Sequence, residues 1–289
     1  MNKLFEGYYL KHQNDSQTLA FIPGRSKTEA FIQVVTDDRS YHVSYPLRQY
    51  STGSGLRVGG SFFSKKGIQL DINQDELTIR GTLRYGPFTP IGGDIMGPFR
   101  FFPMECRHTV VSMRHPVKGT LYINGQPYAF ENGTGYIEGD SGRSFPSSYS
   151  WVHCNRWNAQ RDDCSVMASI AEIPFAGLRF QGCIAVVWLN GQEYRFATYK
   201  GVKIRRRTRQ DIELTQGGMR LAVHIPAHTG HSLKAPDLGD MKRTIHESAA
   251  VRARFLFQQN GQTLLDRWSG LASYEFVQSG DSSELPLVK

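Results

Sequence analysis

Apolar and polar residues alternate with a period of two over long stretches of this 289-residue chain. Leu77, Ile79, Leu83 and Tyr85 are separated by polar residues and one glycine. Residues 251–257 repeat the pattern, with apolar side chains at every second position. This periodicity is typical of antiparallel strands that bury one face and expose the other. We therefore expect a chain that is built mainly from β-strands.

The tripeptide Asn-Gly-Gln occurs at residues 124–126, 190–192 and 260–262, each time between two stretches with strand periodicity. An Asn-Gly pair readily adopts the two positive φ angles of a type I′ turn, a common tight connection of a β-hairpin. We predict a hairpin at each of the three sites. The flanking sequences differ too much to form an internal repeat.

Helical periodicity is scarce. The best helical candidate, residues 164–171, spans two turns at most and is soon followed by Pro174. The 29 glycines and 13 prolines fit a structure with many turns. A β protein of this length must hide its sheet edges in closed barrels or stacked sheets. The predicted fold is all-β with little helix, in two antiparallel β-barrel or β-sandwich units at residues 1–133 and 134–289.

The hydropathy of the chain bears on its location. No stretch approaches the roughly 18 consecutive apolar residues that a membrane-spanning helix needs. Residues 1–9 contain no apolar run of signal-peptide length. We therefore expect a cytoplasmic protein, in which Cys106, Cys154, Cys164 and Cys183 are reduced thiols. Their spacing matches neither a zinc ribbon nor a C-x-x-C motif, which favours packing roles.

The formal net charge of +8 is concentrated in one segment. Its basic residues are Lys200, Lys203, Arg205, Arg206, Arg207 and Arg209. One interpretation is a strand edge whose charges prevent pairing with another chain. A second is peripheral contact with an anionic membrane surface, at the inner face of the membrane. Nucleic acid is a poorer fit, because the segment from residue 203 to 209 has no aromatic side chain that could stack on a base.

Two other motifs favour structural roles. The glycine cluster at residues 53–60 lacks the lysine–serine pair and the following helix of a phosphate loop, so we predict a flexible loop. His224, His228 and His231 have helical spacing, but Pro226 interrupts any helix there. We therefore favour ordinary polar roles over a metal site for these histidines. A serine-hydrolase motif of the form G-x-S-x-G is absent from the sequence.

The segment from residue 135 to 155 carries most of the candidate functional residues. If its first part is extended, Tyr136, Glu138 and Asp140 share one face of a strand. The residues that would share a face after Pro146 are Tyr149, Trp151, His153 and Asn155. Two carboxyl groups close together in an apolar pocket have their pKa values pushed apart, which leaves one of them protonated as an acid. The alternative is a surface turn whose acids contact only water.

The same segment resembles the hallmark motif of the tocopherol cyclase family. The matching residues are Tyr136, Glu138, Asp140, Gly142, Phe145, Pro146, Tyr149, Trp151, Cys154 and Asn155. Residues 5–11, 19–22, 94–99 and 233–236 also look similar to the family, so that the resemblance spans nearly the whole chain. Two residues depart from the motif: Ser141 stands where the family has tryptophan, and His153 where it has glutamine.

The resemblance implies a lipocalin-like β architecture in two units. The plant members of the family close a prenylated benzoquinol into a chromanol ring. That reaction needs a proton for a trisubstituted alkene, shelter for a tertiary cation and capture of the cation by the phenol oxygen. Neither a redox cofactor nor a metal is required. We therefore expect a cofactor-free enzyme that cyclises or hydrates an isoprenoid alkene.

The resemblance also assigns roles to the candidate residues. Glu138 or Asp140 would supply the proton. His153 would accept the phenol proton or orient the ring. The residues that would bind the substrate and stabilise the cation are Tyr136, Tyr149, Trp151 and Asn155.

The alternative function is that of a lipocalin-like, non-catalytic carrier of an apolar small molecule. The partner is a lipophilic small molecule in both cases, and only the carboxyl groups discriminate, because a carrier needs no buried acid. A second group of titratable residues lies at Glu105 and His108. We predict that these two residues do not share a strand face and form a structural ion pair or part of a lid.

Overall fold

The computed structural model describes residues 3–157, 163–175 and 177–278. Within these residues the strands form a 12-stranded and a 10-stranded antiparallel sheet, the first sheet and the second sheet. The order in the first sheet is β4-β3-β2-β1-β12-β10-β9-β8-β7-β6-β5, with β11 paired to β10. The order in the second is β16-β15-β14-β13-β22-β21-β19-β18-β17, with β20 paired to β21.

The elements have the following bounds. The strands of the first sheet are β1 (Phe5–Gln13), β2 (Thr18–Arg25), β3 (Ala30–Val35), β4 (Ser40–Tyr45), β5 (Tyr50–Thr52), β6 (Leu56–Val58), β7 (Ser61–Ser64), β8 (Gly67–Gln74), β9 (Leu77–Tyr85), β10 (Cys106–Ile123), β11 (Gln126–Ala129) and β12 (Gly133–Gly142). Those of the second are β13 (Tyr149–Cys154), β14 (Cys164–Phe175), β15 (Leu178–Leu189), β16 (Gln192–Ala197), β17 (Lys203–Arg207), β18 (Asp211–Gln216), β19 (Met219–His224), β20 (His231–Asp237), β21 (Asp240–Gln259) and β22 (Gln262–Val277). The short 3-10 helices are η1 (Leu47–Gln49), η2 (Gly97–Phe101) and η3 (Thr198–Lys200).

All three Asn-Gly pairs form the predicted turns. They connect β10 to β11, β15 to β16 and β21 to β22. The φ angles at Asn124, Asn190 and Asn260 are 49°, 50° and 50°, and those of the following glycines are 80°, 81° and 82°. Both central residues of each turn therefore adopt the positive φ that a type I′ hairpin requires.

Each sheet curls around an apolar core of its own. Strand β6 contacts β2 and β3 from the other end of the first sheet, and β16 contacts β18 in the same way in the second. Leu19, Ile79 and Phe130 lie inside the first sheet, and Phe196 and Phe255 inside the second. These curled antiparallel sheets confirm the predicted all-β, lipocalin-like barrel or sandwich fold.

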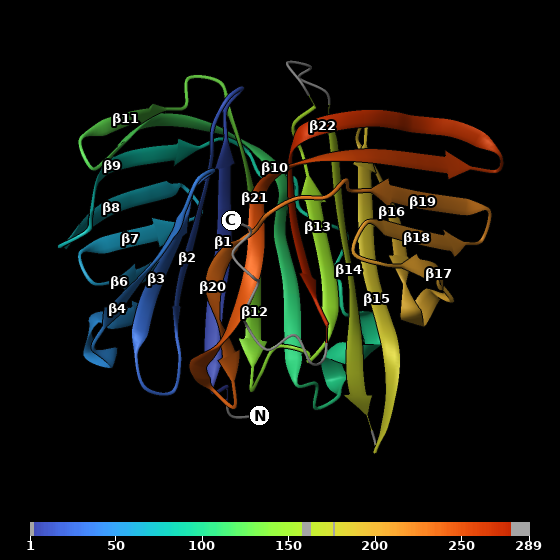
Figure 1. Cartoon of the computed structure of the whole chain (residues 1–289), viewed down its shortest axis with the longest axis horizontal. Helices are drawn as coiled ribbons and strands as arrows, with labels where there is room; N and C mark the ends of the chain where they lie inside the picture. The colour runs from blue at the N-terminus through green and yellow to red at the C-terminus, as the bar shows by residue number, and fades with distance from the viewer. Residues whose placement is uncertain (1–2, 158–162, 176, 279–289) are drawn as a thin grey trace, which may run out of the picture.

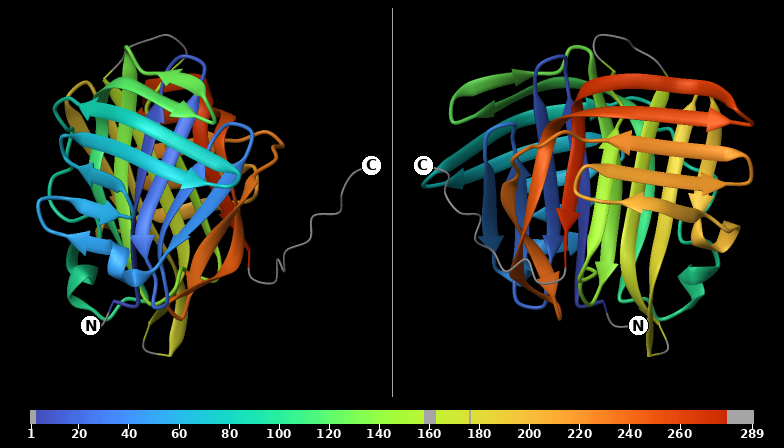
Figure 2. Two further views of the ribbon diagram at one scale, coloured as in Figure 1. Left: turned by 90° about the vertical axis from the view of Figure 1, so that its left-hand side faces the viewer. Right: turned by 45° about the vertical axis from the view of Figure 1, so that its right-hand side comes forward.

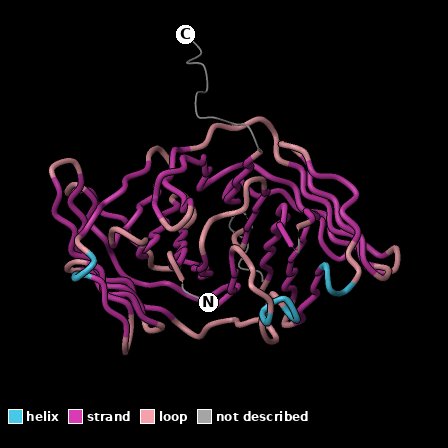
Figure 3. The backbone as a smooth tube through the Cα atoms, turned by 90° about the horizontal axis from the view of Figure 1, so that it is seen from below, coloured by secondary structure: helices cyan, strands magenta, loops and turns pink. Residues whose placement is uncertain are grey.

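A third apolar cluster lies between the two sheets. It includes Tyr9 and Met113 from the first sheet and Trp151, Met167 and Val186 from the second. Figure 1 shows the long strands of both sheets side by side at the centre of the molecule, and Figure 3 shows the same two lobes from below. Strand β20 reaches across to β3 and β4 of the first sheet. Residues of this third cluster form the wall of a cavity between the sheets, where the candidate site lies.

The chain passes from the first sheet to the second between Gly142 and Tyr149. The predicted boundary at residues 133/134 coincides with the start of β12, which pairs with β1 and β10 of the first sheet. The strands from β13 to β22 nevertheless form one continuous sheet, the second sheet (Figure 2). The division of the chain into two domains stays a prediction.

The helical prediction for residues 164–171 is wrong, because these residues begin strand β14. Cys164, Val166, Ala168 and Ile170 point into the core of the second sheet, while Met167 packs in the cluster between the sheets. Burial on both faces removes the polar residues that would have marked a strand, and short apolar runs are ambiguous for that reason.

The glycine cluster at residues 53–60 is not one flexible loop. Its middle part forms strand β6, which pairs with β5 and β7, so that the glycines occupy the turns on either side. His224, His228 and His231 each have a separate partner. His224 bonds Asp211, while His228 and His231 bond backbone carbonyl oxygens.

The basic segment contains strand β17, which is the edge strand of the second sheet. Arg206 pairs with Asp211. Arg207 turns inward and donates to Ser148, Ser150 and the carbonyl oxygen of Val277. One of the predicted membrane-facing charges is thus bonded within the fold, and peripheral membrane contact stays a prediction. Within the described residues, no helix is both long and apolar enough to cross a membrane.

The cysteines are free thiols. Cys154, Cys164 and Cys183 are buried and pack in the core of the second sheet, as expected. Cys106 lies apart from them, in the wall of the cavity between the sheets.

Candidate functional site

A cavity of about 170 Å³ lies between the two sheets. Its lining is mostly aromatic and aliphatic, and includes Phe99, Phe145, Tyr149, Trp151, Phe180 and Ile245. The polar side chains in the wall are few, as is usual for sites that bind small molecules. His108, Glu138 and Asp140 from the first sheet and Glu275 from the second are among them.

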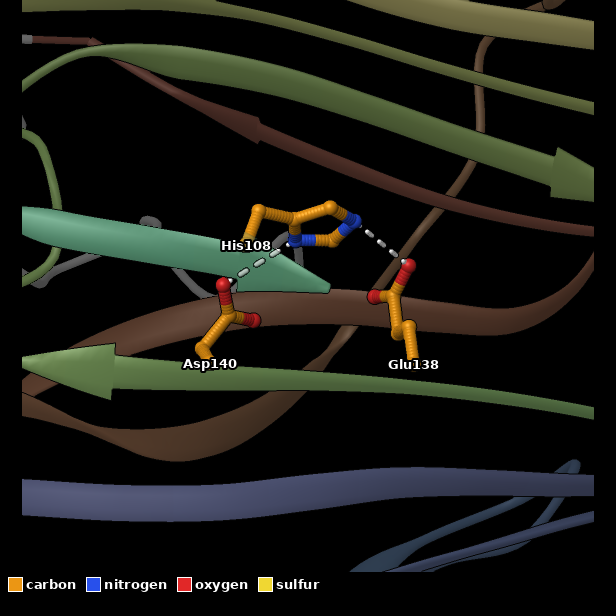
Figure 4. A group of neighbouring side chains, drawn as sticks. All are labelled: His108, Glu138 and Asp140. Atoms are coloured by element: carbon orange, nitrogen blue, oxygen red, sulfur yellow. Dashed lines mark hydrogen bonds and ion pairs between the residues drawn. The ribbon is translucent and has the colours of Figure 1, made fainter. Parts of the chain in front are cut away.

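His108, Glu138 and Asp140 form a compact group, here named the first acid cluster (Figure 4). His108 lies on β10 directly opposite Asp140 on β12, and Glu138 lies two residues from Asp140 on the same face. The Nδ1 atom of His108 is 3.0 Å from Oδ1 of Asp140, and its Nε2 atom is 3.2 Å from Oε2 of Glu138. The imidazole therefore stands between two carboxyl groups.

The electrostatics of this cluster favour a charged imidazole. Burial of His108 acts to lower its pKa, but the neighbouring carboxylates of Glu138 and Asp140 outweigh burial and raise the pKa well above its usual value. His108 is thus an imidazolium at neutral pH, with Nδ1 hydrogen-bonded to Asp140 and Nε2 ion-paired with Glu138. The cluster thus places a charged imidazole between two carboxyl groups in the wall of an apolar cavity.

Glu138 is oriented by two further donors. The hydroxyl of Tyr136 donates to Oε2 of Glu138 at 2.5 Å, and Nε1 of Trp151 donates to the same atom at 3.1 Å. These donors fix the carboxyl group in one position between β12 and β13. Trp151 thereby joins the second sheet to the first acid cluster.

Behind Tyr136 lies a buried layer of polar side chains. The ring of His153 stacks on Tyr136 with centroids 3.6 Å apart, and Nδ1 of His153 is 3.4 Å from Nζ of Lys11. Burial and the Lys11 charge hold the pKa of His153 well below its usual value. His153 is therefore neutral and accepts from Lys11.

The predicted site residues thus fall into two layers. Glu138, Asp140, Tyr149 and Trp151 line the cavity. The residues that lie behind the cavity wall are Tyr136, His153 and Asn155. Asn155 donates to the carbonyl oxygens of Met113 and Gly135, so that it ties β13 to the first sheet. From these positions His153 and Asn155 can orient residues of the cavity wall. Neither residue lines the cavity, so neither is placed to accept a proton directly from a bound substrate. Of the two departures from the family motif, Ser141 also lies outside the cavity lining.

Sequence reasoning missed the role of His108. The sequence predicts that His108 forms a structural ion pair or part of a lid with Glu105. The pairing of β10 with β12 instead brings His108 opposite Asp140. Glu247 and Glu275, in the wall of the second sheet, were missed as well. Each is an acid within an otherwise apolar and small-residue stretch of a strand, and this isolation was the available signal.

The first acid cluster has the residue types of a metal site, since one atom from each of its three side chains lies within 4.8 Å of the others. Both ring nitrogens of His108 already face a carboxylate. A metal would have to displace a proton from one nitrogen, and only a neutral imidazole binds a metal. The geometry therefore suits proton transfer better than metal binding.

Known proteins resemble this chain in both sequence and structure. The family model described as tocopherol cyclase-like matches residues 73–276. A comparison with curated proteins found no significant match. Kievitone hydratase from Nectria haematococca has a TM-score of 0.59 at 12% identity, with 93% of this chain and 88% of that one covered.

A second solved structure, CghA with Sch210972, has a TM-score of 0.59 at 9% identity, with 96% and 89% of the two chains covered. At such identities the structural likeness shows a shared fold only. The family match covers more than half of the chain and includes the first acid cluster. The chain belongs to the tocopherol cyclase-like family.

Proposed function

We propose that this protein is a cofactor-free cyclase or hydratase that protonates the alkene of a prenylated quinol or related isoprenoid. One observation carries the proposal: an ion-paired group of two carboxyls and an imidazolium stands in the wall of an aromatic, otherwise apolar cavity. A buried ionic group costs free energy, so that its presence in a ligand cavity favours a chemical role.

The reaction would proceed by acid–base chemistry. A proton adds to the less substituted carbon of the alkene and leaves a tertiary cation on the other. The faces of Tyr149 and Trp151 can stabilise that cation. A phenol oxygen of the same molecule, or water, then bonds to the cation and releases its own proton. Glu138 and Asp140 line the cavity and are ion-paired with His108, so that this cluster can exchange a proton with the substrate.

Family membership supports an intramolecular cyclisation, and the fold shared with a hydratase supports addition of water as the variant reaction. The two outcomes differ only in which oxygen captures the cation. An apolar cavity also fits the alternative, a carrier that binds a lipophilic molecule without changing it. The buried charged cluster is what favours the enzyme, because a carrier gains no affinity from it.

The test is incubation with a prenyl-substituted benzoquinol in D₂O under anaerobic conditions. Wild-type protein should yield a chromanol, or a tertiary alcohol, with one deuterium on the former alkene carbon. Glu138→Gln and Asp140→Asn should each lower turnover at least roughly tenfold. Asp71→Asn is a matched control, because Asp71 pairs with Arg80 on the surface of the first sheet.

Recovery of unchanged quinol bound to wild-type protein would support the carrier instead. Turnover at the wild-type rate in both cluster variants would remove Glu138 and Asp140 from the mechanism.

A further inference from the structure

A second pair of acids lies in the second sheet, whereas the first acid cluster belongs to the first sheet. Glu275 on β22 and Glu247 on β21 are directly opposite each other in the register of the second sheet, and Trp151 on β13 is the opposite neighbour of Glu275 on its other side. Residues directly opposite on neighbouring strands project from the same face of a sheet. Trp151, Glu275 and Glu247 thus form a row, and Trp151 at its end contacts Glu138.

The two glutamates occupy different depths of the cavity wall. Glu275 lines the cavity, so that a bound ligand can reach its carboxyl group. Glu247 is fully buried behind it. The hydroxyl of Tyr149 donates to Glu275 at 2.6 Å, and the hydroxyl of Tyr9 donates to Oε1 of Glu247. Both tyrosines line the cavity as well.

In the first acid cluster the cationic His108 pairs with both carboxyl groups, and the two glutamates have no such paired cation among the described residues. Within the described residues, neither glutamate makes an ion pair, and Oε2 of Glu247 has no hydrogen-bond partner. The groups that act on the pair electrostatically are Glu138, Asp140, Lys11, Tyr9 and Tyr149. Lys11 is the one cation among them, and it bears on Glu247 rather than on Glu275.

Two neighbouring carboxyls in one apolar enclosure cannot both ionise at low cost. Burial, followed by the charge of Glu247, raises the pKa of Glu275 well above its usual value. Burial raises the pKa of Glu247 to about 7. Burial and the neighbouring Glu247 therefore favour the protonated form of Glu275, which lines the cavity, whereas His108 carries the proton of the first acid cluster.

We propose that Glu275 is the acid that protonates the alkene, that Glu247 is its positioning residue, and that the first acid cluster accepts the proton released by the attacking oxygen. This inference rests on the proposed function and divides its acid and base roles between the two sheets. The O–H bond of Glu275 breaks as the new C–H bond forms, and the cation develops on the more substituted carbon. The C–O bond then forms while the oxygen's proton passes to the first acid cluster. Exchange with solvent returns a proton to Glu275 and removes one from the cluster.

The first experiment needs no substrate. Infrared difference spectra of wild-type protein and Glu275→Gln at pH 7 should show a protonated-carboxyl C=O band that the variant lacks. Glutamine is close to glutamate in shape and still accepts from Tyr149, and circular dichroism checks that the variant is folded. The absence of this band would overturn the proposal whatever the substrate is.

The second experiment uses the quinol assay. Glu275→Gln should lower kcat at least roughly a hundredfold with little change in KM. In Glu247→Gln the alkaline limb of the kcat–pH profile should move to lower pH, because removal of a neighbouring negative charge makes Glu275 a stronger acid. A merely structural role of Glu247 would leave that limb in place.

The outcomes separate the two proposals. Wild-type turnover in Glu275→Gln, with loss of turnover in Glu138→Gln and Asp140→Asn, would overturn the role of Glu275 and keep the proposed function. A wild-type protein that shows the infrared band but binds the quinol without converting it would overturn the proposed function, and with it the acid role of Glu275 in catalysis.

Discussion

Lys11 on β1 is a lysine in an almost fully enclosed position, with 1% of its surface exposed. Its ammonium group lies 3.4 Å from Nδ1 of His153 and donates to the carbonyl oxygen of Leu271 at 3.2 Å. Burial lowers its pKa from 10.5 to about 8, although the neighbouring acidic groups of Cys154, Glu247, Asp37 and Glu138 act in the opposite direction. The folded protein therefore carries an incompletely compensated buried charge.

We predict that Lys11→Met stabilises the protein at pH 7. The difference between a pKa of 10.5 in the unfolded chain and about 8 in the folded state corresponds to a cost of about 3.4 kcal/mol. Loss of the two long hydrogen bonds to the carbonyl oxygen of Leu271 and to His153, at 3.2 and 3.4 Å, together offsets about 1 kcal/mol of the gain. Gln13 continues to donate to that carbonyl oxygen at 2.7 Å, so that it is not left unsatisfied. The expected net gain in free energy of unfolding at pH 7 is about 2 kcal/mol.

The pH dependence gives the sharper test. Below pH 8 Lys11 is charged in both states, and its full cost is present. Between pH 8 and 10.5 the folded state loses this proton while the unfolded chain keeps it, so that the stability of wild-type protein rises with pH. The advantage of Lys11→Met should therefore shrink to near zero at about pH 10.

Urea unfolding of both proteins at pH 7 and pH 10 measures these differences. Lys118→Met is the matched control, since Lys118 is exposed on β10 and its replacement should change stability by less than about 0.5 kcal/mol at either pH. A Lys11→Met protein that is less stable than wild type at pH 7, or whose difference from wild type does not depend on pH, would refute the reasoning.

Four further changes test other parts of the structure. Arg207→Ala removes three hydrogen bonds to the β13 and β22 ends and should lower the free energy of unfolding by about 2–3 kcal/mol in urea titrations. Met167→Ala opens a cavity in the fully buried cluster between the sheets and should cost about 2–4 kcal/mol by the same assay. Asn190→Ala should cost about 1 kcal/mol because of its positive φ, whereas Asn190→Gly should be nearly neutral in thermal unfolding. Tyr136→Phe removes a donor to Glu138 and should lower kcat about tenfold with KM unchanged, and equal kcat values would contradict that role.

The sequence predicts much of this fold because its turns and its one-sided strands are encoded locally. An Asn-Gly pair needs only its own two φ angles to form a hairpin, and all three pairs do so. Strand β9 has the bounds that its alternation predicts. Strand β14 could not be predicted in this way, because it is covered on one face by its own sheet's core and on the other by the cluster between the sheets.

The candidate site was predictable only within single strands. Glu138 and Asp140 lie on one face of β12, as a two-residue period requires. His108 joins them through the pairing of β10 with β12, and β-bulges near residues 110–115 interrupt the register of that pair. Glu275 lies on β22 of the second sheet and lines the same cavity. A single sequence contains no local pattern that specifies such long-range pairings.

The position of the cavity between two separately cored sheets has a consequence for how the ligand can change during evolution. Each sheet keeps its interior when side chains in the gap are exchanged, because Leu19, Ile79, Phe196 and Phe255 do not contact the ligand space. Half-buried cavity residues such as Phe99 and Phe180 can therefore be replaced at small expense to folding. A scaffold of this kind separates the residues that fill the two sheet interiors from those that line the cavity.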